Sequence, residues 1–305
     1  MKGDVITVSE TIRVATRSSR LAIIQTREVI ELLKLESPHD IEVEIVKTKS
    51  RGDVVRDRPL HKLGEKGVFV KEVDKLVLEG KADIAVHSAK DVPSVVDYPV
   101  DVAAVPPRRD PRECLVSPHG GLKELPRGAT VGTSSPRRRA QILLERPDLK
   151  VEPMRGNVDT RVSKVRRGEY DAAVLAKVGL DRLGITSAVS EVYDPEEFVP
   201  PAGQGALMVT CRKDDDRVKR LLEVVDDEKS RVEVETEKAV VRELGVSCSE
   251  PVGVHVRARD GGYVRLVLGV FEEEGSCGHV LKVRGSPEDV VREVVSHARE
   301  VISDG

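Results

Sequence analysis

Short apolar runs alternate with amphipathic stretches along the first two thirds of the chain. Residues 12–15 and 41–46 have the composition and alternation of strands. Between them, Ser18 or Ser19 is placed to cap a helix that runs to about Leu35. The apolar face predicted for this helix consists of Leu21, Ile24, Leu32 and Leu35.

A second helix and a third strand follow. A polar loop over 48–66 leads into a predicted helix over 68–79, which stops at Gly80. The apolar run over 83–86 then indicates a short buried strand. The order of elements in this part is therefore β-α-β-α-β.

The same order recurs further along the chain. Its predicted elements are a strand at 130–131, a helix that begins at Ser135-Pro136, a strand at 149–152, a helix from about Asp159 to Gly168, and a strand at 171–175. Residues 80–86 and 168–174 share Gly, Asp, Ala and Val at matching positions. Duplication and the ordinary use of Ala and Val in buried strands both explain this. Either way, alternating strands and helices predict an α/β sheet in each of two similar lobes.

The C-terminal part follows a different pattern. A helix over 228–244, three strands with glycine turns and a final helix over 287–302 predict a small α+β domain with an antiparallel sheet. Two proline-rich stretches, 105–111 and 195–201, are suited to connect the lobes. The predicted domains are 1–105 plus 200–224 for the first α/β lobe, 106–199 for the second, and 225–305 for the α+β domain.

Charge separates one part of the chain from the rest. The 305 residues carry 50 Lys+Arg and 53 Asp+Glu, a net charge of −3. Residues 132–182 hold 12 basic and 7 acidic residues, which gives +5, whereas 213–305 hold 15 and 21, which gives −6. With aromatic residues at 2%, base-stacking surfaces are scarce. A basic stretch in an acidic chain favours capture of a small anion over nucleic-acid binding.

Cysteine spacing and apolar runs limit the class of protein further. Cys114, Cys211, Cys248 and Cys277 form no CxxC pair and no zinc-type spacing with histidine, so no metal site is predicted. No apolar run approaches the roughly 18 residues of a membrane span, and the N-terminal residues lack a signal-peptide core. We therefore expect a cytoplasmic protein that does not associate with membranes.

Arginines follow predicted strand ends at three junctions. Gly132-Thr133-Ser134-Ser135-Pro136-Arg137-Arg138 turns from a strand into a helix, whose free N–H groups and dipole favour an anion. The guanidinium forks of these arginines match carboxylates. Thr16-Arg17-Ser18-Ser19 and Arg155-Gly156-Asn157, which continues to Arg161, repeat this arrangement. A solvated arginine face of the helix is the alternative for the first of these segments taken alone.

Two further residues are candidates for chemistry. Asp91 lies in His87-Ser88-Ala89-Lys90-Asp91-Val92-Pro93, directly after a buried strand. An ordinary surface Lys–Asp ion pair and a counter-charge for a cation formed in a reaction both suit it. Cys248 follows a predicted helix in a turn-like segment, where a thiolate can be a nucleophile, although a lone cysteine is commonly a small buried residue.

In combination these motifs resemble the porphobilinogen deaminase (hydroxymethylbilane synthase) family of tetrapyrrole biosynthesis over about residues 11–253. The matching segments are Ala15–Ser19, Gly64–Glu72, Asp83–Pro93, Gly132–Arg138, Arg155–Asn157 and Gly203–Ala206. The resemblance implies two lobes related to the type II periplasmic binding proteins and a small third domain. It also implies a monomeric enzyme that condenses four porphobilinogen molecules head to tail into hydroxymethylbilane and releases ammonia.

The same resemblance implies a cofactor and roles for single residues. A dipyrromethane, made from substrate, is expected on Cys248 through a thioether. Asp91 is expected to stabilise the methylene-pyrrolenine cation left when ammonia departs. The residues expected to hold the acetate and propionate groups of cofactor and substrate, or to make further polar contacts, are Arg17, Ser19, Lys62, Lys66, Ser88, Lys90, Ser135, Arg137, Arg138, Arg155, Arg161 and Arg182.

One segment departs from the family pattern. The family's cysteine is usually preceded by Gly-Gly and followed by Gln or Arg, but here Val246-Ser247 precede Cys248 and Ser249 follows it. Valine and serine tolerate positive φ less well than glycine, so the sequence leaves the conformation of this loop open. A non-catalytic, bilobed anion-binding protein is the competing hypothesis; it accounts for the lobes and arginines but does not require Cys248, Asp91 or a third domain.

Overall fold

The structure is a computed structural model that describes residues 10–48, 68–247, 249–272 and 274–303. The chain forms two compact units. The first contains 1–107 and 207–231, and the second contains 108–206 and 232–305. The chain therefore passes from one unit to the other at three places.

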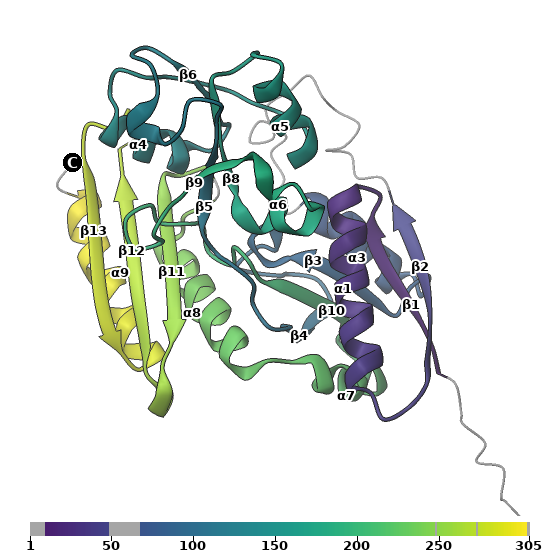
Figure 1. The fold of residues 1–305 in the computed structure, drawn as a ribbon. Coiled ribbons are helices and arrows are strands. Elements are labelled where there is room, and N and C mark those ends of the chain that lie inside the picture. Colours follow the sequence, from purple (N-terminus) through teal and green to yellow (C-terminus); the bar gives the residue numbers. More distant parts are fainter. Residues whose placement is uncertain (1–9, 49–67, 248, 273, 304–305) are drawn as a thin grey trace, which may run out of the picture. The chain divides into compact units, whose positions relative to one another are not determined.

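The first unit is built on a five-stranded sheet with the order β2-β1-β3-β10-β4. Strands β1, β2 and β3 are parallel, and β10 is antiparallel to both β3 and β4 (Figure 1). The strands are β1 (Glu10–Arg17), β2 (Ile41–Thr48), β3 (Ile84–Ser88), β4 (Val100–Ala104) and β10 (Leu207–Arg212). The helices are α1 (Arg20–Glu36), α3 (Val68–Leu78) and α7 (Asp216–Leu222).

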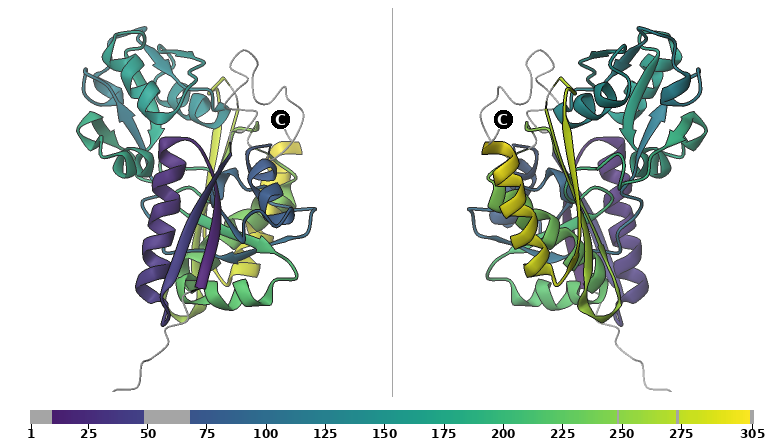
Figure 2. Two further views of the ribbon diagram at one scale, coloured as in Figure 1. Left: turned by 90° about the vertical axis from the view of Figure 1, so that its right-hand side faces the viewer. Right: turned by 90° about the vertical axis from the view of Figure 1, so that its left-hand side faces the viewer.

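The two faces of this sheet bury different side chains because successive strand residues point to opposite sides. Ile12 and Val14 pack against α1 and α7, whereas Ala15 and Ala85 pack against α3. Figure 2 shows α1 and α3 on opposite faces.

The apolar face predicted for α1 was wrong in part: Leu32 packs against the core, and Leu21 and Ile24 are half-buried. Leu35 is 77% exposed, and the buried residues of the helix are Gln25, Thr26, Val29 and Leu33. Two polar side chains lie on the buried face because both are hydrogen-bonded: Gln25 donates to Ser88 Oγ at 2.9 Å, and the Thr26 hydroxyl donates to the Ala22 carbonyl at 2.9 Å. Ser19, rather than Ser18, caps the helix by accepting from Ala22 N.

The second unit contains a sheet with the equivalent arrangement, in the order β7-β6-β8-β5-β9. Strands β6, β7 and β8 are parallel, and β5 is antiparallel to β8 and β9. The strands are β5 (Glu113–Val116), β6 (Thr130–Gly132), β7 (Lys150–Glu152), β8 (Ala172–Ala176) and β9 (Val189–Val192). Helix α4 (Pro136–Glu145) packs on one face, and α5 (Val158–Arg166) and α6 (Lys177–Leu183) pack on the other.

A three-stranded antiparallel sheet in the order β11-β12-β13 also belongs to the second unit. Its elements are α8 (Glu228–Leu244), which begins in the first unit, β11 (Val252–Ala258), β12 (Val264–Phe271), β13 (Gly278–Gly285) and α9 (Pro287–Ser303). Helices α8 and α9 cover one face, as Figure 2 shows for α9. On the other face, Val267 and Phe271 pack against Ala140 of α4 and Val199.

The fold class predicted from the sequence is confirmed: two α/β lobes are combined with a small α+β part. The strands β4, β5, β9 and β10 were not predicted. They form the antiparallel pairs of the two large sheets: β10 with β3 and β4, and β5 with β8 and β9. Short 3-10 helices complete the description: η2 (Ala89–Asp91), η3 (Leu122–Glu124), η4 (Thr186–Ala188), η5 (Glu223–Val225) and η6 (Asp260–Gly262). No helix in the described ranges is both long and apolar enough to cross a bilayer.

Candidate active site

In the first unit, one edge of the sheet collects the predicted polar residues. Strands β1 and β3 are parallel neighbours, so their carboxyl ends lie at the same edge. Arg17 ends β1 and Ser88 ends β3, and the amide of Gln25 links Ser88 to α1. Lys90 and Asp91 follow immediately in η2. The carboxyl edge of an α/β sheet is a usual place for a ligand.

Asp91 is exposed at this edge. Its carboxylate has no hydrogen bond or ion pair within the part of the chain that the structure describes. The neighbouring Lys90 is half-buried. The alternative of a Lys90–Asp91 surface ion pair is therefore not what the structure shows, and the carboxylate is accessible to a ligand.

A buried hydrogen-bond network lies directly behind this loop. Asp74 of α3 is fully buried, and its Oδ1 is 2.7 Å from His87 Nε2 and 2.7 Å from the Thr210 hydroxyl. Its Oδ2 accepts from the Tyr98 hydroxyl at 2.7 Å. Burial opposes ionisation of Asp74, but the hydrogen bonds from His87, Thr210 and Tyr98 outweigh it and lower the pKa of the carboxyl group. The network fixes the end of β3, from which Lys90 and Asp91 project.

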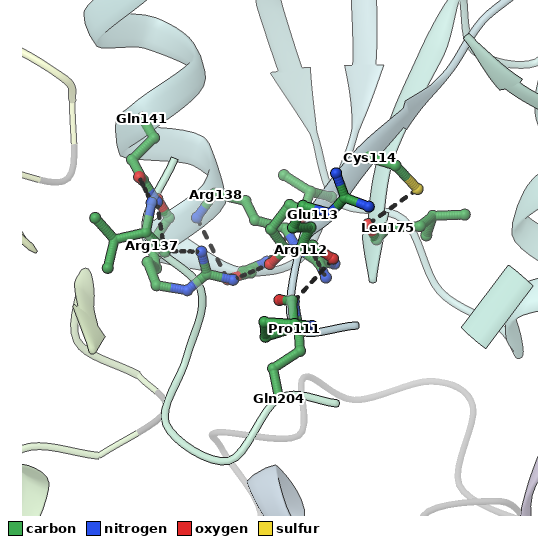
Figure 3. Close-up of polar contacts among 12 residues, drawn as sticks. Pro111, Arg112, Glu113, Cys114, Arg137, Arg138, Gln141, Leu175 and Gln204 are labelled. Carbon is green, nitrogen blue, oxygen red and sulfur yellow. Dashed lines mark hydrogen bonds and ion pairs between the residues drawn. The ribbon is translucent and has the colours of Figure 1, made fainter. Parts of the chain in front are cut away.

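In the second unit, the start of α4 holds two of the predicted arginines. Ser135 caps the helix by accepting from Arg138 N, and Pro136 occupies the first turn. Arg137 and Arg138 are only 4% and 8% exposed, and both bond the fully buried carboxylate of Glu113 on β5. Figure 3 shows both guanidinium groups directed at Glu113. The helix start is therefore rigid as well as cationic.

Two more predicted arginines belong to the same cationic cluster. Arg155 follows β7 in the turn before α5, and Arg161 lies in α5 with its Nε donating to the Gly156 carbonyl at 2.8 Å. Burial, together with repulsion from Arg138 and Arg155, lowers the pKa of Arg161 to about 10. Like charges held this close favour binding of an anion. Arg182, half-buried, lies in the last turn of α6.

Three predicted site residues, Lys62, Lys66 and Cys248, lie outside the described residues. The residues that flank Cys248 are described. Gly245 takes a positive φ of 69°, and no described residue other than glycine does so, including Val246, Ser247 and Ser249. The two residues that replace the family's Gly-Gly, Val246 and Ser247, therefore cause no backbone strain.

The serines of this loop converge on one carboxylate. Ser247 donates its N–H and its hydroxyl to Glu250 Oε2 at 2.6 and 2.7 Å, and the Ser249 hydroxyl donates at 3.2 Å. Partial burial opposes ionisation, but these hydrogen bonds prevail and lower the pKa of Glu250. Glu250 thus organises the segment on both sides of Cys248.

The sequence analysis missed several residues of these networks. Asp74 interrupts an apolar helical stripe that contains Val70, Val73 and Val77, and a single acid in such a stripe signals a buried polar contact. Glu113 begins the apolar run Cys114-Leu115-Val116, where a charge requires a partner. Across residues 10–48, 68–247, 249–272 and 274–303, no group of three or more His, Cys, Asp or Glu could hold a metal ion.

Comparison with known proteins agrees with these motifs. The family described as "Porphobilinogen deaminase, dipyromethane cofactor binding domain" matches residues 12–220. A probable porphobilinogen deaminase of Methanopyrus kandleri is 93% identical over 298 residues, which cover 98% of this chain and 100% of that protein. Porphobilinogen deaminase of Roseiflexus sp. (strain RS-1) is 43% identical over 272 residues, covering 85% of this chain and 89% of that protein. The chain belongs to the porphobilinogen deaminase family.

Solved structures with a similar backbone are more distant. The periplasmic VFT2 domain of Bordetella pertussis BvgS has 18% identity and a TM-score of 0.41, covering 71% of this chain and 86% of that one. The periplasmic aliphatic sulphonate binding protein SsuA of Escherichia coli has 15% identity and a TM-score of 0.41, covering 76% and 70%.

Proposed function

We propose that this chain is a hydroxymethylbilane synthase, which condenses four porphobilinogen molecules head to tail in tetrapyrrole biosynthesis. The observation that carries the proposal is the exposed carboxylate of Asp91 at the sheet edge in a member of this family. A cytoplasmic monomer is part of the proposal. The reaction needs groups that bind carboxylates and a group that stabilises a cation, and the chain has residues suited to both.

Each addition exchanges a C–N bond for a C–C bond. The protonated amino group of the aminomethyl substituent leaves porphobilinogen as ammonia, and the methylene carbon stays on the pyrrole as a methylene-pyrrolenine cation. The α-carbon of the growing chain attacks the methylene carbon and then loses its proton. A carboxylate about 4 Å from such a cation contributes roughly 4 kcal/mol at an effective dielectric of 20. We assign this stabilisation to Asp91, whose side chain is already accessible.

The cluster of Arg138, Arg155 and Arg161 suits a cofactor that carries several carboxylates. When bound, dipyrromethane supplies the anchored pyrrole to which substrate units are added. We assign its thioether to Cys248, between the serines that Glu250 organises. The further residues proposed to contact acetate and propionate groups are Arg17, Ser19, Lys62, Lys66, Ser88, Lys90, Ser135, Arg137 and Arg182.

Intact mass is the first test, measured on the purified protein and on Cys248→Ala. We expect an excess equal to two porphobilinogen units less two ammonias in the first protein and the bare polypeptide mass in the variant. A bare mass in both is followed by incubation with porphobilinogen or preformed hydroxymethylbilane. If no mass is added and no porphobilinogen is consumed, the proposal fails and a non-catalytic anion-binding protein replaces it.

Thiol labelling of the native protein provides a second measurement. Cys114 and Cys211 are buried, and burial raises the pKa of these thiols to about 12 and about 11. They should therefore resist iodoacetamide, whereas the partly exposed Cys277 serves as the internal positive control. Labelling of Cys248 should occur in cofactor-free protein and be absent after loading. Equal labelling in both states contradicts the attachment point.

A further inference from the structure

The second unit buries two glutamate–arginine clusters that differ in their balance of charge. In the first, which we call the Glu113 cluster, Glu113 Oε1 accepts from Arg137 and from Arg138 Nε, the latter at 3.0 Å, and its Oε2 accepts from Arg138 Nη2 at 2.7 Å (Figure 3). One carboxylate therefore faces two guanidinium groups. The fork of Arg138 is engaged by both oxygens, which fixes its plane.

The second, the Glu237 cluster, has the opposite balance. Arg108 donates to both oxygens of Glu237 at 2.8 and 3.2 Å and to Glu233 at 3.3 Å. The N–H groups of Gly203 and Val256 also donate to Glu237, at 2.6 and 2.8 Å. One arginine thus serves two carboxylates, and backbone donors supply the remainder. These contacts connect chain segments to one another.

By contrast, additional arginines lie near the Glu113 cluster. Arg138 is close enough to Arg161 to lower the pKa of that side chain, and Arg155 adds to the effect. Arg155 and Arg161 are half-buried, so positive charge extends from the buried Glu113 cluster toward the surface. An anionic ligand is attracted to such a concentration of positive charge. The charge of these arginines therefore points to an anionic ligand beside the Glu113 cluster.

We propose that Glu113 is a positioning residue for carboxylate binding: it holds Arg137 and Arg138 side by side at the start of α4. The proposal rests on the proposed function, because the carboxylates are those of porphobilinogen and the growing chain. Arg137 is held at its other end as well, since its Nη1 donates to the Val199 carbonyl at 2.6 Å. Gln141 binds both the N–H and the carbonyl of Val199, so Arg137 and Gln141 together attach the first half of α4 to the backbone of Val199.

A simpler role for Glu113 makes the opposite prediction. If this glutamate only neutralised charge, Glu113→Gln would make the cluster more cationic and tighten binding of an anion. If it positions the arginines, the same variant loses their alignment and weakens binding. Glu113→Asp separates the two roles further, because it keeps the charge but shortens the side chain by one methylene.

Steady-state kinetics with porphobilinogen test the proposal in Glu113→Gln, Glu113→Asp and the matched control Glu233→Gln, which alters a buried carboxylate of the Glu237 cluster. We expect KM to rise about tenfold in Glu113→Gln and less in Glu113→Asp, with a smaller change in kcat, and no change of KM in Glu233→Gln. An unchanged or lower KM in Glu113→Gln overturns the proposal. A thermal melt of each variant separates this effect from loss of stability.

Nuclear magnetic resonance of protein labelled with ¹⁵N-arginine gives a readout that needs no activity. The Arg138 Nε–H signal, assigned by its loss in Arg138→Lys, should be protected from exchange in the wild type and in Glu233→Gln but not in Glu113→Gln. Added propionate should shift it in the wild type. If that pattern appears but porphobilinogen is not consumed, the proposed function fails while the positioning role stands. If porphobilinogen is consumed but the signal is equally protected in Glu113→Gln, the positioning role fails alone.

Discussion

The two five-stranded sheets repeat one another most closely where no chemistry is proposed. Asp83 N donates to the Arg13 carbonyl and its carboxylate accepts from Arg13 N at 2.8 Å. In the other sheet, Asp171 N donates to the Thr130 carbonyl and its carboxylate accepts from Thr130 N at 2.7 Å. The aspartates that the two segments share therefore have the same structural role, because each closes the entry into the third parallel strand.

The sheets differ at the opposite ends of the same strands. The register places Ala85 and Ala173 at equivalent positions, beside Ala15 and Gly132. Counting forward from them, the position of Asp91 in the first unit corresponds to Gly179 in the second. Across the antiparallel pair, Leu207 lies opposite Ser88, whereas Glu113 lies opposite Ala176.

With the roles proposed for Asp91 and for the arginines, one scaffold has two uses. The first unit presents an accessible carboxylate, which suits a developing cation. The second buries its carboxylate between arginines, which suits bound carboxylates. Shared residues maintain the fold, and the roles that we propose belong to unshared residues at equivalent positions.

The largest effect is expected from Asp91→Asn. Removing the charge that we propose stabilises the cation should lower kcat for porphobilinogen consumption by about 10²–10³-fold, with little change in KM. The melting temperature should remain that of the wild type, because this side chain is exposed and makes no contact that the described residues record.

Asp97→Asn is the matched control for this variant. Asp97 is an exposed acid of the same unit, with a side chain 75% accessible and only a 3.8 Å ion pair to Lys71. It should retain full activity. If Asp91→Asn also consumes porphobilinogen at the wild-type rate, Asp91 does not have the role proposed for it. The proposed difference between the two sheets then fails for the first unit.

The next largest effect concerns stability and its dependence on pH. Asp74→Asn removes the charge that accepts hydrogen bonds from His87, Thr210 and Tyr98, and should cost about 2–3 kcal/mol of unfolding free energy at pH 7. Because the folded pKa of Asp74 lies below its ordinary value of 3.8, this contribution is complete above that value and is lost as the pH falls toward the folded pKa.

Chemical denaturation at pH 7 and at pH 3 measures the effect. The difference between wild type and Asp74→Asn should shrink at the lower pH, while Asp97→Asn stays within about 0.5 kcal/mol of the wild type throughout. A difference that is independent of pH would mean that the variant disturbs packing rather than an ionised group.

Sequence patterns predicted most of the parallel strands and helices because their apolar periodicity is local. They did not predict β10 or β5, since each is a short run that becomes a strand only by pairing with β3 or β8 far along the chain. The same limit applies to the site. Arg137 and Arg138 stood out at a helix start, but Glu113 lies 24 residues before the first of them, and only the fold brings them together.

The predicted role of the second unit is tested by Arg155→Leu. Loss of a charged hydrogen-bond donor should raise KM for porphobilinogen roughly ten- to a hundredfold, equivalent to about 1.5–3 kcal/mol, with a smaller effect on kcat. It should also relieve part of the repulsion that lowers the pKa of Arg161. Arg166→Leu, which alters an exposed arginine on α5, is the control and should leave KM unchanged.

The smallest expected effect concerns the stability contributions of the two equivalent aspartates, Asp83 and Asp171. Asp83→Ala and Asp171→Ala each remove a hydrogen bond to the backbone of the adjacent strand, and each should cost about 1 kcal/mol. Asp171 has an exposed ion pair to His119 at 3.8 Å, whereas Asp83 has a closer partner, because its Oδ1 lies 2.8 Å from Arg13 Nη2. The Asp83–Arg13 pair is partly exposed, so the loss of unfolding free energy in Asp83→Ala should exceed that in Asp171→Ala by no more than about 0.5–1 kcal/mol. This excess should vanish when both substitutions are made in an Arg13→Ala background. Guanidinium denaturation of Asp83→Ala and Asp171→Ala, each alone and each combined with Arg13→Ala, measures this excess. An excess that survives in that background would show that the two aspartates do not have equivalent roles.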